Sequence, residues 1–300
     1  MKAHTPPFTP VRVLLLILWS ILFTSIQSSA TEARAPRILI DSAHYNFHTV
    51  ERRYAPLARL LNDTGFRVQS TTSPFTPELL ATTDALVIAN ALHISNVDRW
   101  ALPVESALSE QETASLVTWV ENGGALLLIA DHFPFPGAVA DLASRFGFRF
   151  LNGFAIRSDA PTEDIFDLET GSLKNHSGIT GAELNPPVQT IATFTGSAFE
   201  APTEAQPLMV LGSDYELWLT SRAWEFQPDT PRRPASGLMQ GATRSFGKGR
   251  VAVFAEAAMF TSQIAPDGQT SIGFDAPAAR DNRAFIVNIF RWLTEPLNLR

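Results

Sequence analysis

Three strongly apolar segments of this sequence run directly into polar residues that can do chemistry, and this pattern most constrains the fold. The three junctions are Arg37–Ile40 followed by Asp41–His48, Ala125–Ala130 followed by Asp131-His132, and Val251–Ala255 followed by Glu256. In an open parallel α/β sheet the carboxyl ends of the strands share one edge, and ligands bind in the crevice there. The sequence therefore predicts one rim that gathers histidine and carboxylate side chains from distant parts of the chain.

Helical stretches separate the apolar strands. Apolar residues at helical spacing mark a helix near Val50–Asn62, and Ser109-Glu110-Gln111-Glu112 is a capping box that opens another. Short apolar runs at Phe66–Gln69 and Asp84–Ala89 are typical of further strands. Near-continuous apolar strands separated by helices predict an α/β fold with a mainly parallel sheet covered on both faces.

The middle of the chain, about residues 152–243, has a different composition. Gly, Pro, Ser and Thr are common there and helical periodicity is weak, which predicts a β-rich elaboration inserted into the α/β core. We expect two short strands at Pro207–Leu211 and Glu216–Thr220, joined as a hairpin. The core pattern resumes at Gly249–Glu256 and closes with an amphipathic helix at Asp281–Leu293.

The N-terminus has the organisation of a signal peptide. Lys2 and Arg12 precede an apolar run, Val13–Ile26, and the small residues Ser28-Ser29-Ala30 offer a cleavage site. The alternative is an uncleaved membrane anchor, but the run of 14 residues is shorter than the ~20 that a spanning helix needs. We therefore expect residues 1–30 to be removed on export to the periplasm or the medium, with no stable membrane insertion afterwards.

Composition excludes several kinds of site. The sequence has no cysteine, so it has no disulfide, no thiolate metal site and no cysteine nucleophile. Without Lys2 and Arg12, two of its 23 basic residues, the exported chain carries 21 basic against 30 acidic side chains. The sequence contains no basic run, and nucleic acid is therefore not an expected partner.

The polar segment after the first strand contains two histidines four residues apart. His44 and His48 would share one face of a helix, a spacing that suits a divalent metal, whereas in a loop the spacing fixes no geometry. Asp41 and Asn46 are further candidates for binding substrate together with these histidines. The structural alternative is that Asn46 and Thr49 cap the following helix. Substrate binding by this segment, with or without a metal at His44 and His48, is the functional expectation.

Asp131 and His132 leave a buried strand abruptly. The segment Phe133–Gly137 that follows contains two prolines, which stiffen the loop. A rigid loop at a sheet edge favours a catalytic pair over the alternative, in which Asp131 accepts backbone N–H groups and His132 packs in the wall. Glu256 ends the third strand, where it would be an acid or base with a raised pKa, a ligand, or an anchor for a neighbouring loop.

Other histidines and the aromatic residues are weaker candidates. His176 lies in the segment Asn175–Gly181 of the elaboration, where it would bind substrate or cap a turn. His93 follows a strand and is a minor candidate. Five tryptophans are expected to serve packing more than sugar binding: Trp100, Trp119, Trp218, Trp224 and Trp292.

Four segments together carry a family resemblance. They are the strand leading into Asp41–Thr49, the Leu116–Gly124 unit with the strand into Asp131-His132, the segment His176–Gly181, and Gly249–Phe254 with the closing Asp281-Asn282 helix. His176–Gly181 is similar to a His-Pro-Ile-Thr-x-Gly segment, with Ser177 in place of the proline. In these segments the chain resembles the class I glutamine amidotransferase-like superfamily, and within it the trehalose-utilisation-type branch and related exported domains of unknown function.

The resemblance implies a flavodoxin-like three-layer α/β/α fold, formed by a single domain at residues 37–294. It does not imply amidotransferase chemistry, because true members place a cysteine on a tight strand-to-helix turn and this chain has none. Asp131 and His132 occupy the corresponding turn, where the trehalose-utilisation branch also tends to carry a histidine.

Two classes of function remain after these exclusions. One is a hydrolase-like or lyase-like enzyme that acts on a small polar or carbohydrate-derived substrate with a His/Asp/Glu site. The other is a non-catalytic domain that binds a small molecule or a partner on the same fold. The sequence has no Gly-x-Ser-x-Gly elbow of a serine hydrolase and no glycine-rich phosphate loop. Fold alone does not decide between the two classes.

Overall fold

The computed structural model describes residues 1–4, 34–159, 163–265 and 267–295. The chain divides into two units, Met1–Arg34 and Ala35–Arg300, and every described helix and strand lies in the second. Apart from residues 1–4, the predicted signal peptide at residues 1–30 lies outside the described residues. None of the helices that are described is long and apolar enough to cross a membrane.

A mixed sheet, nine-stranded within the described residues, forms the centre of the second unit. Its strands follow the order β2-β1-β3-β4-β14-β13-β9-β5, with β10 paired to β13. The neighbours from β2 to β14 in this order run parallel, and the remaining pairs are antiparallel. The strands are β1 (Arg37–Asp41), β2 (Arg67–Thr71), β3 (Ala85–Ala89), β4 (Ala125–Ile129), β5 (Arg149–Leu151), β9 (Ala198–Glu200), β10 (Gln206–Val210), β13 (Met239–Phe246) and β14 (Gly249–Phe254).

The central parallel strands are buried on both faces, which explains their continuous apolar sequences. All residues of β4 are buried. Leu127 and Ile129 belong to one hydrophobic cluster, and Leu126 and Leu128 to the other, because successive side chains of a strand point to opposite faces. The sheet therefore separates two cores.

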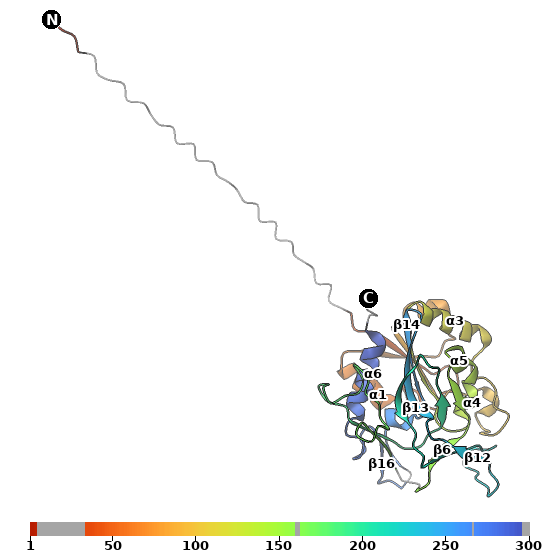
Figure 1. Ribbon diagram of the computed structural model, residues 1–300. Helices are drawn as coiled ribbons and strands as arrows, with labels where there is room; N and C mark the ends of the chain where they lie inside the picture. The colour runs from red at the N-terminus through yellow and green to blue at the C-terminus, as the bar shows by residue number, and fades with distance from the viewer. Residues whose placement is uncertain (5–33, 160–162, 266, 296–300) are drawn as a thin grey trace. The chain divides into compact units, whose positions relative to one another are not determined.

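Helices pack against both faces of the sheet. Residues of α1 and α6 belong to the same cluster as Leu127, whereas residues of α2, α3, α4 and α5 belong to the cluster of Leu126. Figure 1 shows α1 and α6 on one side of β13 and β14, and α3, α4 and α5 on the other. The helices are α1 (Ala55–Asp63), α2 (Pro77–Leu80), α3 (Glu110–Glu121), α4 (Phe135–Ala138), α5 (Ala140–Arg145) and α6 (Asn282–Thr294), with 3₁₀ turns η1 (Ile94–Asn96) and η2 (Ala258–Phe260).

Local sequence explains where α3 begins and how the next strands meet it. Ser109 and Glu112 form the expected capping box, in which each side chain accepts the backbone N–H of the other residue. After α3, Gly123 adopts a φ of +115°, which favours glycine, and the chain enters β4. Gly249 opens β14 so close to α3 that a Cβ atom there would lie 2.1 Å from the carbonyl oxygen of Val120.

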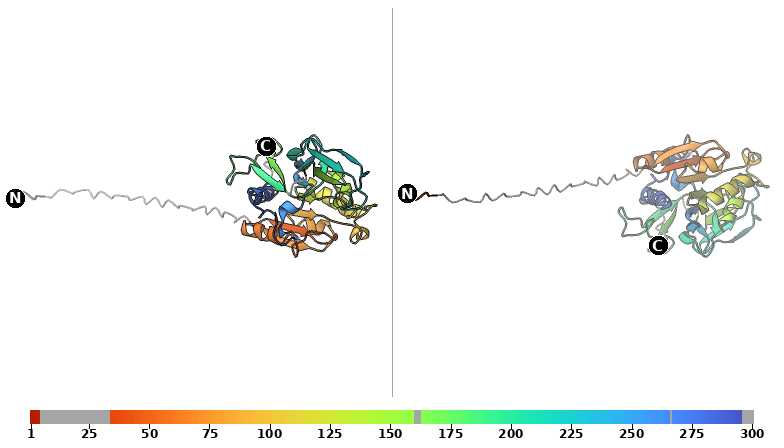
Figure 2. Two further views of the ribbon diagram at one scale, coloured as in Figure 1. Left: turned by 90° about the horizontal axis from the view of Figure 1, so that it is seen from below. Right: turned by 90° about the horizontal axis from the view of Figure 1, so that it is seen from above.

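The predicted elaboration at about residues 152–243 is rich in strands, and part of it extends the main sheet. Strands β9, β10 and β13 join that sheet, while β6, β11 and β12 form a separate three-stranded sheet. Strands β7 and β8 pair beside α6, as Figure 2 shows in green and blue, and β15 pairs with β16. These strands are β6 (Phe154–Arg157), β7 (Asp164–Asp167), β8 (Thr190–Thr193), β11 (Tyr215–Trp218), β12 (Arg232–Pro234), β15 (Ser262–Ile264) and β16 (Ser271–Gly273).

The hairpin expected between Pro207–Leu211 and Glu216–Thr220 is wrong. Both strands exist, as β10 and β11, but β10 pairs with β13, and β11 pairs with β6 and β12. Strand pairing here is set by distant partners, so the short connection between the two strands carries no information on it. At the level of class, the expected α/β fold with a large and largely parallel sheet is confirmed.

Candidate functional site

Four polar residues mark the carboxyl edge of the parallel strands. Asp41 is the last residue of β1, and Asn90 follows the last residue of β3. Asp131 and Glu256 each lie two residues beyond the ends of β4 and β14, whose last residues pair as Ile129 and Phe254. All four side chains are buried. Parallel strands share direction, so the edge predicted from the sequence is where the structure places these residues.

Asn90 connects the loop after β1 to the loop after β4. Its Oδ1 accepts the backbone N–H of Asp131 at 2.9 Å, and its Nδ2 donates to Nδ1 of His48 at 3.1 Å. A backbone N–H is always a donor, so the contact with Asp131 shows which atom of the Asn90 amide is the oxygen. Asn90 has a φ of +48°, a left-handed conformation that asparagine tolerates better than most residues. It therefore positions His48 against Asp131.

His48 and His132 present opposite hydrogen-bonding roles. The amide of Asn90 donates to Nδ1 of His48, so the hydrogen of the neutral ring lies on Nε2. Nδ1 of His132 lies 2.7 Å from the carbonyl oxygen of Phe133, which can only accept, so His132 carries its hydrogen on Nδ1. Neither Nε2 atom has a hydrogen-bond partner among the described residues. One ring thus offers a donor and the other an acceptor.

Burial keeps His48 uncharged. Removal from water, helped by the charges of Arg53 and His132, lowers the pKa of His48 to about 3. The ring is 3 % exposed and packs on Tyr54 with a centroid separation of 4.9 Å. His132 is also buried and stacks on Phe154, with ring centroids 4.7 Å apart and planes within 7°. Both imidazoles are therefore held in fixed orientations.

Asp131 and Glu256 form a pair of interacting buried carboxyl groups. Burial raises the pKa of both, and the charge of Asp131 raises that of Glu256 further. Oδ1 of Asp131 accepts the N–H of His132 at 2.8 Å. The two oxygens of Glu256 accept the N–H groups of Ala258 and Met259 at 2.9 and 2.7 Å. The effect of the Asp131 charge on Glu256 favours a state in which the pair holds a proton.

A second cluster surrounds His44. Its Nδ1 lies 2.9 Å from Oδ2 of Asp41, and its Nε2 lies 3.0 Å from Oε1 of Glu112. Burial opposes a charge on His44, but the hydrogen bond and charge of Asp41, together with Glu112, outweigh it and raise the pKa of His44. Asn46 completes the cluster, because its Nδ2 donates to Oδ2 of Asp41 at 2.9 Å. These side chains brace the loop after β1.

A pocket of about 300 Å³ opens at this edge, and we name it the carboxyl-edge pocket. Its walls combine aromatic rings with the polar groups described above. Its lining residues are Phe47, His48, Arg53, Asn90, Trp100, Asp131, His132, Phe135, Phe194, Thr195, Trp224, Ala258, Gln263 and Ile272. Asp131 lines it, whereas Glu256 does not. The members of the His44 cluster do not line it either.

The structure does not bring His44 and His48 together as metal ligands. Both ring nitrogens of His44 contact carboxylates, whereas Nδ1 of His48 binds Asn90. Across the described ranges, no group of three or more His, Cys, Asp or Glu side chains is arranged to hold a metal ion. In this structure, hydrogen bonds within the protein account for the positions of the two rings.

The remaining histidines lie elsewhere. His176 lines a different pocket with Arg250 and Trp292, away from the carboxyl edge. His93 caps η1, where its ring nitrogen accepts the N–H of Ser95. The structure therefore gathers His48, Asp131 and His132 around one pocket and separates His176 from it.

Sequence reasoning missed four residues of this edge. Asn90 directly follows an apolar strand, so the rule that identified Asp131 would have found it. Glu112 was recognised only as part of a capping box, although it also contacts His44. The sequence predicts packing roles for Trp100 and Trp224, and no local pattern indicates that they line the pocket.

Comparison with known proteins identifies the fold. No protein-family model matches the chain, and no curated protein matches its sequence. The structure described as mmIFT52 N-terminal domain is similar over 88 % of this chain and 99 % of its own, with 15 % identity and a TM-score of 0.60. Cytoplasmic Protein STM1381 from Salmonella typhimurium LT2 is similar over 87 % of this chain and 100 % of its own, with 16 % identity and a TM-score of 0.53.

A weaker likeness connects the chain to a thua-like protein from Bacteroides uniformis ATCC 8492. It covers 88 % of this chain and 94 % of that one, with 13 % identity and a TM-score of 0.49. A score of this size carries no conclusion about activity. The two stronger likenesses show that this chain has a fold already seen in solved structures, at sequence identities where fold alone is shared.

Proposed function

We propose that the carboxyl-edge pocket binds a small polar, carbohydrate-derived molecule and hydrolyses it with Asp131, His132 and Glu256. One observation carries the proposal. His48 and His132 line one pocket with aromatic walls, beside a buried carboxyl pair, and their rings have opposite hydrogen-bonding roles. Sugars offer both hydroxyl groups and apolar ring faces. The volume of about 300 Å³ suits a ligand of monosaccharide size.

The proposed roles follow from the hydrogen bonds. Nε2–H of His48 donates to a substrate oxygen, and Nε2 of His132 takes a proton from the attacking water. Asp131, which lines the pocket and whose pKa burial raises, delivers a proton to the leaving group, and the interacting Glu256 sets how readily the pair holds that proton. Asn90 positions both sides of the pocket through its two contacts.

A second candidate is binding without catalysis, and one specific observation favours it. Both oxygens of Glu256 and Oδ1 of Asp131 already accept backbone N–H groups. Carboxylates engaged in this way anchor loops and need no chemical role. On this alternative the pocket recognises its ligand through the same aromatic rings and imidazoles, and no bond is broken.

Titration with a panel of mono- and disaccharides, together with hydrolysis assays on nitrophenyl glycosides, tests the proposal. We expect the parent to bind and hydrolyse a sugar compound, His132→Ala to lose both, and Asp131→Asn to bind but turn over at least 100-fold more slowly. His93→Ala is the matched control, since it removes a histidine outside the pocket. Binding without turnover by the parent supports the second candidate, and no binding by any sugar rejects both.

We also propose that the chain is a divergent member of the glutamine amidotransferase-like superfamily, in its trehalose-utilisation-type branch, with a flavodoxin-like three-layer core. Support comes from the four sequence segments that resemble the family and from helices on both faces of a largely parallel sheet. An alignment of homologues linking these segments to that branch is the test. Homologues that align instead with another superfamily would reject the assignment.

Export to the periplasm or the medium is a separate proposal that rests on residues 1–30 of the sequence. N-terminal sequencing of protein recovered outside the cytoplasm should begin near Thr31. Recovery of a chain that still carries residue 1 from the membrane fraction would favour the anchor instead.

A further inference from the structure

A second pocket of about 380 Å³ lies over the hairpin of β13 and β14, and we name it the β13–β14 pocket. It shares no residue with the carboxyl-edge pocket. Its rim is exposed and its base is buried, so a ligand would enter from solvent and reach buried groups. The lining residues are His176, Ser177, Glu204, Gln206, Thr243, Arg244, Ser245, Arg250 and Trp292.

Strand register places three polar side chains of the hairpin on one face. Ser245 pairs with Arg250 and Thr243 pairs with Ala252, and paired residues of antiparallel strands project to the same side. Thr243, Ser245 and Arg250 therefore point toward His176 and Trp292. Arg244 alternates to the other face of the strand, where its Nη1 donates to the carbonyl oxygen of Phe146 at 2.5 Å, although the residue still forms part of the pocket lining.

Arg250 is a largely buried cation that forms no hydrogen bond through Nε or Nη1 with any described residue. The residue is 9 % exposed, and its Nε and Nη1 atoms are buried with no hydrogen-bond partner in the described part of the chain. Its guanidinium carbon lies 5.0 Å from the ring centroid of Trp292, a cation–π contact that offsets only part of the cost of burial. Burial lowers the pKa of Arg250, and the charge of Glu295 opposes this change.

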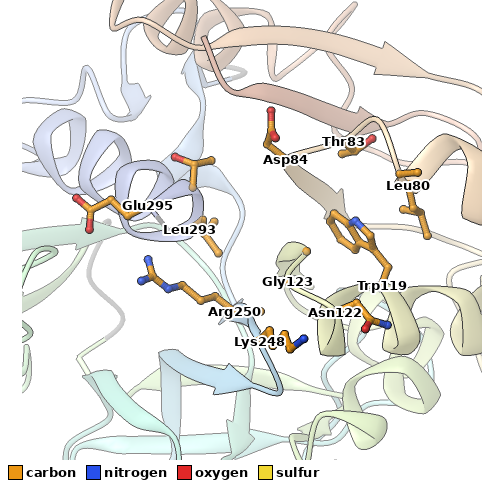
Figure 3. A pocket seen from close by; sticks show the side chains of 14 residues that line it. Leu80, Thr83, Asp84, Trp119, Asn122, Gly123, Lys248, Arg250, Leu293 and Glu295 are labelled. Atoms are coloured by element: carbon orange, nitrogen blue, oxygen red, sulfur yellow. The ribbon is translucent and has the colours of Figure 1, made fainter. Parts of the chain in front are cut away.

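The Arg250 side chain points away from Lys248. Figure 3 shows the neighbouring pocket at the amino end of the sheet, with Lys248 and Trp119 on one side. The guanidinium of Arg250 extends away from both and lies below Leu293 of α6. Arg250 therefore lines both pockets, and its guanidinium lies on the side of Leu293 and Glu295, away from Lys248.

His176 supplies a second unused polar atom at the base of the pocket. The residue is 4 % exposed, its Nε2 lies 3.1 Å from Oγ1 of Thr243, and its Nδ1 is buried without a hydrogen-bond partner among the residues that the structure describes. Burial lowers the pKa of His176, and although backbone groups of Ser177 and His176 oppose this, Arg250 lowers it further. When the Thr243 hydroxyl donates to Nε2, the ring hydrogen lies on Nδ1 and is available to an acceptor.

We propose that the β13–β14 pocket binds a phosphoryl or sulfuryl group, held by the guanidinium of Arg250 and Nδ1–H of His176. Arg250 and His176 each carry a buried donor atom without a hydrogen-bond partner among the described residues, and both line the pocket with Ser245. A tetrahedral oxyanion accepts from the guanidinium, from Nδ1–H and from the Ser245 hydroxyl, while the Thr243 hydroxyl donates to Nε2 of His176 and orients the ring. The two carboxylates nearby do not fill this role. Glu204 lies at the rim 3.8 Å from Arg244, and Glu295 is exposed.

The size of the pocket favours an oxyanion carried on a small molecule over a free ion. A volume of about 380 Å³ exceeds what one phosphate or sulfate fills. The exposed rim residues Ser177 and Gln206 offer hydrogen bonds to the remainder of such a molecule. The ligand class is therefore a small phosphorylated or sulfated metabolite, and its source is resolved by the experiment.

Calorimetric titration at constant ionic strength tests the proposal with three probes: inorganic phosphate, sulfate and a hexose phosphate, with the free hexose as reference. We expect saturable binding of the anions, and tighter binding of the hexose phosphate than of phosphate. Arg250→Met should weaken the binding of each anion at least 10-fold. Lys248→Gln removes an exposed positive charge outside the pocket and should change affinity less than 2-fold.

Thermal unfolding with and without 50 mM phosphate provides the control for folding. Arg250→Met should unfold at or above the parental temperature without anion, because replacing an unpaired buried charge with an apolar side chain of similar length relieves desolvation. Phosphate should then stabilise the parent more than this variant, since general salt effects act on both equally. If Arg250→Met fails to fold, His176→Asn and Ser245→Ala replace it in the titration.

Three results would overturn the proposal. The first is anion affinity in Arg250→Met equal to that of the parent. The second is an equal loss in Lys248→Gln, which would place the anion in the neighbouring pocket. The third is the absence of saturable binding by any of the three anions. Equal affinity for phosphate and the hexose phosphate would retain the anion site but assign it to the free ion.

Discussion

Asp131 and Glu256 follow two adjacent parallel strands, each two residues past the last pair of β4 and β14, Ile129 and Phe254. Burial raises the pKa of both groups, and the charge of Asp131 raises the pKa of Glu256 further. The sheet therefore enforces a carboxyl pair that retains a proton at pH values where isolated carboxyl groups would be ionised.

This pair should make stability fall as pH rises. Between the unfolded-state pKa values, near 3.8 and 4.5, and the higher folded-state values, the folded protein binds more protons than the unfolded chain. Each excess proton lowers stability by about 1.4 kcal/mol per pH unit over that window. In Asp131→Asn the pKa of Glu256 should fall, and denaturant unfolding from pH 4 upward should show a flatter decline than in the parent.

Asp164→Asn is the control for this experiment. Asp164 is another buried aspartate with a raised pKa, but it lies beside Tyr215 and Arg157, not beside Glu256. Its substitution should leave the pKa of Glu256 unchanged in a carboxyl NMR titration. An unchanged Glu256 titration in Asp131→Asn would show that the two carboxyl groups do not interact.

The His44 cluster should stabilise the protein in acid and lose its effect in base. The pKa of His44 is raised above its ordinary 6.5, so its contribution is fully present below pH 6.5 and is lost as pH rises through the folded-state value. Glu112→Gln removes one carboxylate partner and should lower the pKa of His44. We expect the free energy of unfolding of this variant to be lower than that of the parent by ~1–3 kcal/mol at pH 5.5 and by less at pH 9, measured by denaturant unfolding.

Glu110→Gln is the matched control, because Glu110 lies in the same first turn of α3 and has no contact with His44. Like Glu112→Gln, this substitution removes one negative charge from the start of α3, so it reproduces any effect of that charge on the helix. A similar cost in both variants would assign the effect of Glu112→Gln to the helix end and not to His44.

Trp224→Ala should weaken ligand binding more than it destabilises the fold. The side chain is 54 % exposed, and its ring packs edge-on against His132 with centroids 4.6 Å apart. Loss of the ring removes a wall of the carboxyl-edge pocket but about 1 kcal/mol or less of packing. Titration with the best-binding sugar should show at least a 10-fold loss, while Ile94→Ala, a comparably exposed apolar site, should show none. Unchanged affinity in Trp224→Ala would exclude Trp224 from recognition.

Gly249→Ala should be severely destabilising. A Cβ at this position would lie 2.1 Å from the carbonyl oxygen of Val120 and 2.2 Å from that of Gly124, and neither backbone group can move independently of α3 and β4. We expect a loss of ~3 kcal/mol or more in the free energy of unfolding. Gly212→Ala, whose Cβ would meet only the mobile side chain of Asp214, should cost under ~1 kcal/mol. Similar losses at both positions would contradict the tight contact.

The strands of the carboxyl edge were predictable because their sequences carry a local signal. A short apolar run such as Ala125–Ile129, bounded by Gly124 and Asp131, is typical of a buried strand, and Asp131 comes just after its end. The same holds for the helix opened by Ser109, whose cap is a local hydrogen-bond pattern. The pairing of β10 with β13 was not predictable, because it joins segments that no local pattern connects.

The sequence by itself determined which residues end the strands, and therefore that Asp41, Asp131 and Glu256 reach one edge. Only the tertiary structure decided which of the polar residues at this edge line the pocket and which form the separate His44 cluster. It turned His44 toward Asp41 and Glu112, and it placed His48 and His132 on a pocket walled by tryptophans from distant loops. The physical reason is that apolar periodicity is a property of consecutive residues, whereas hydrogen-bond partners are selected by which loops the packed sheet brings within about 3 Å.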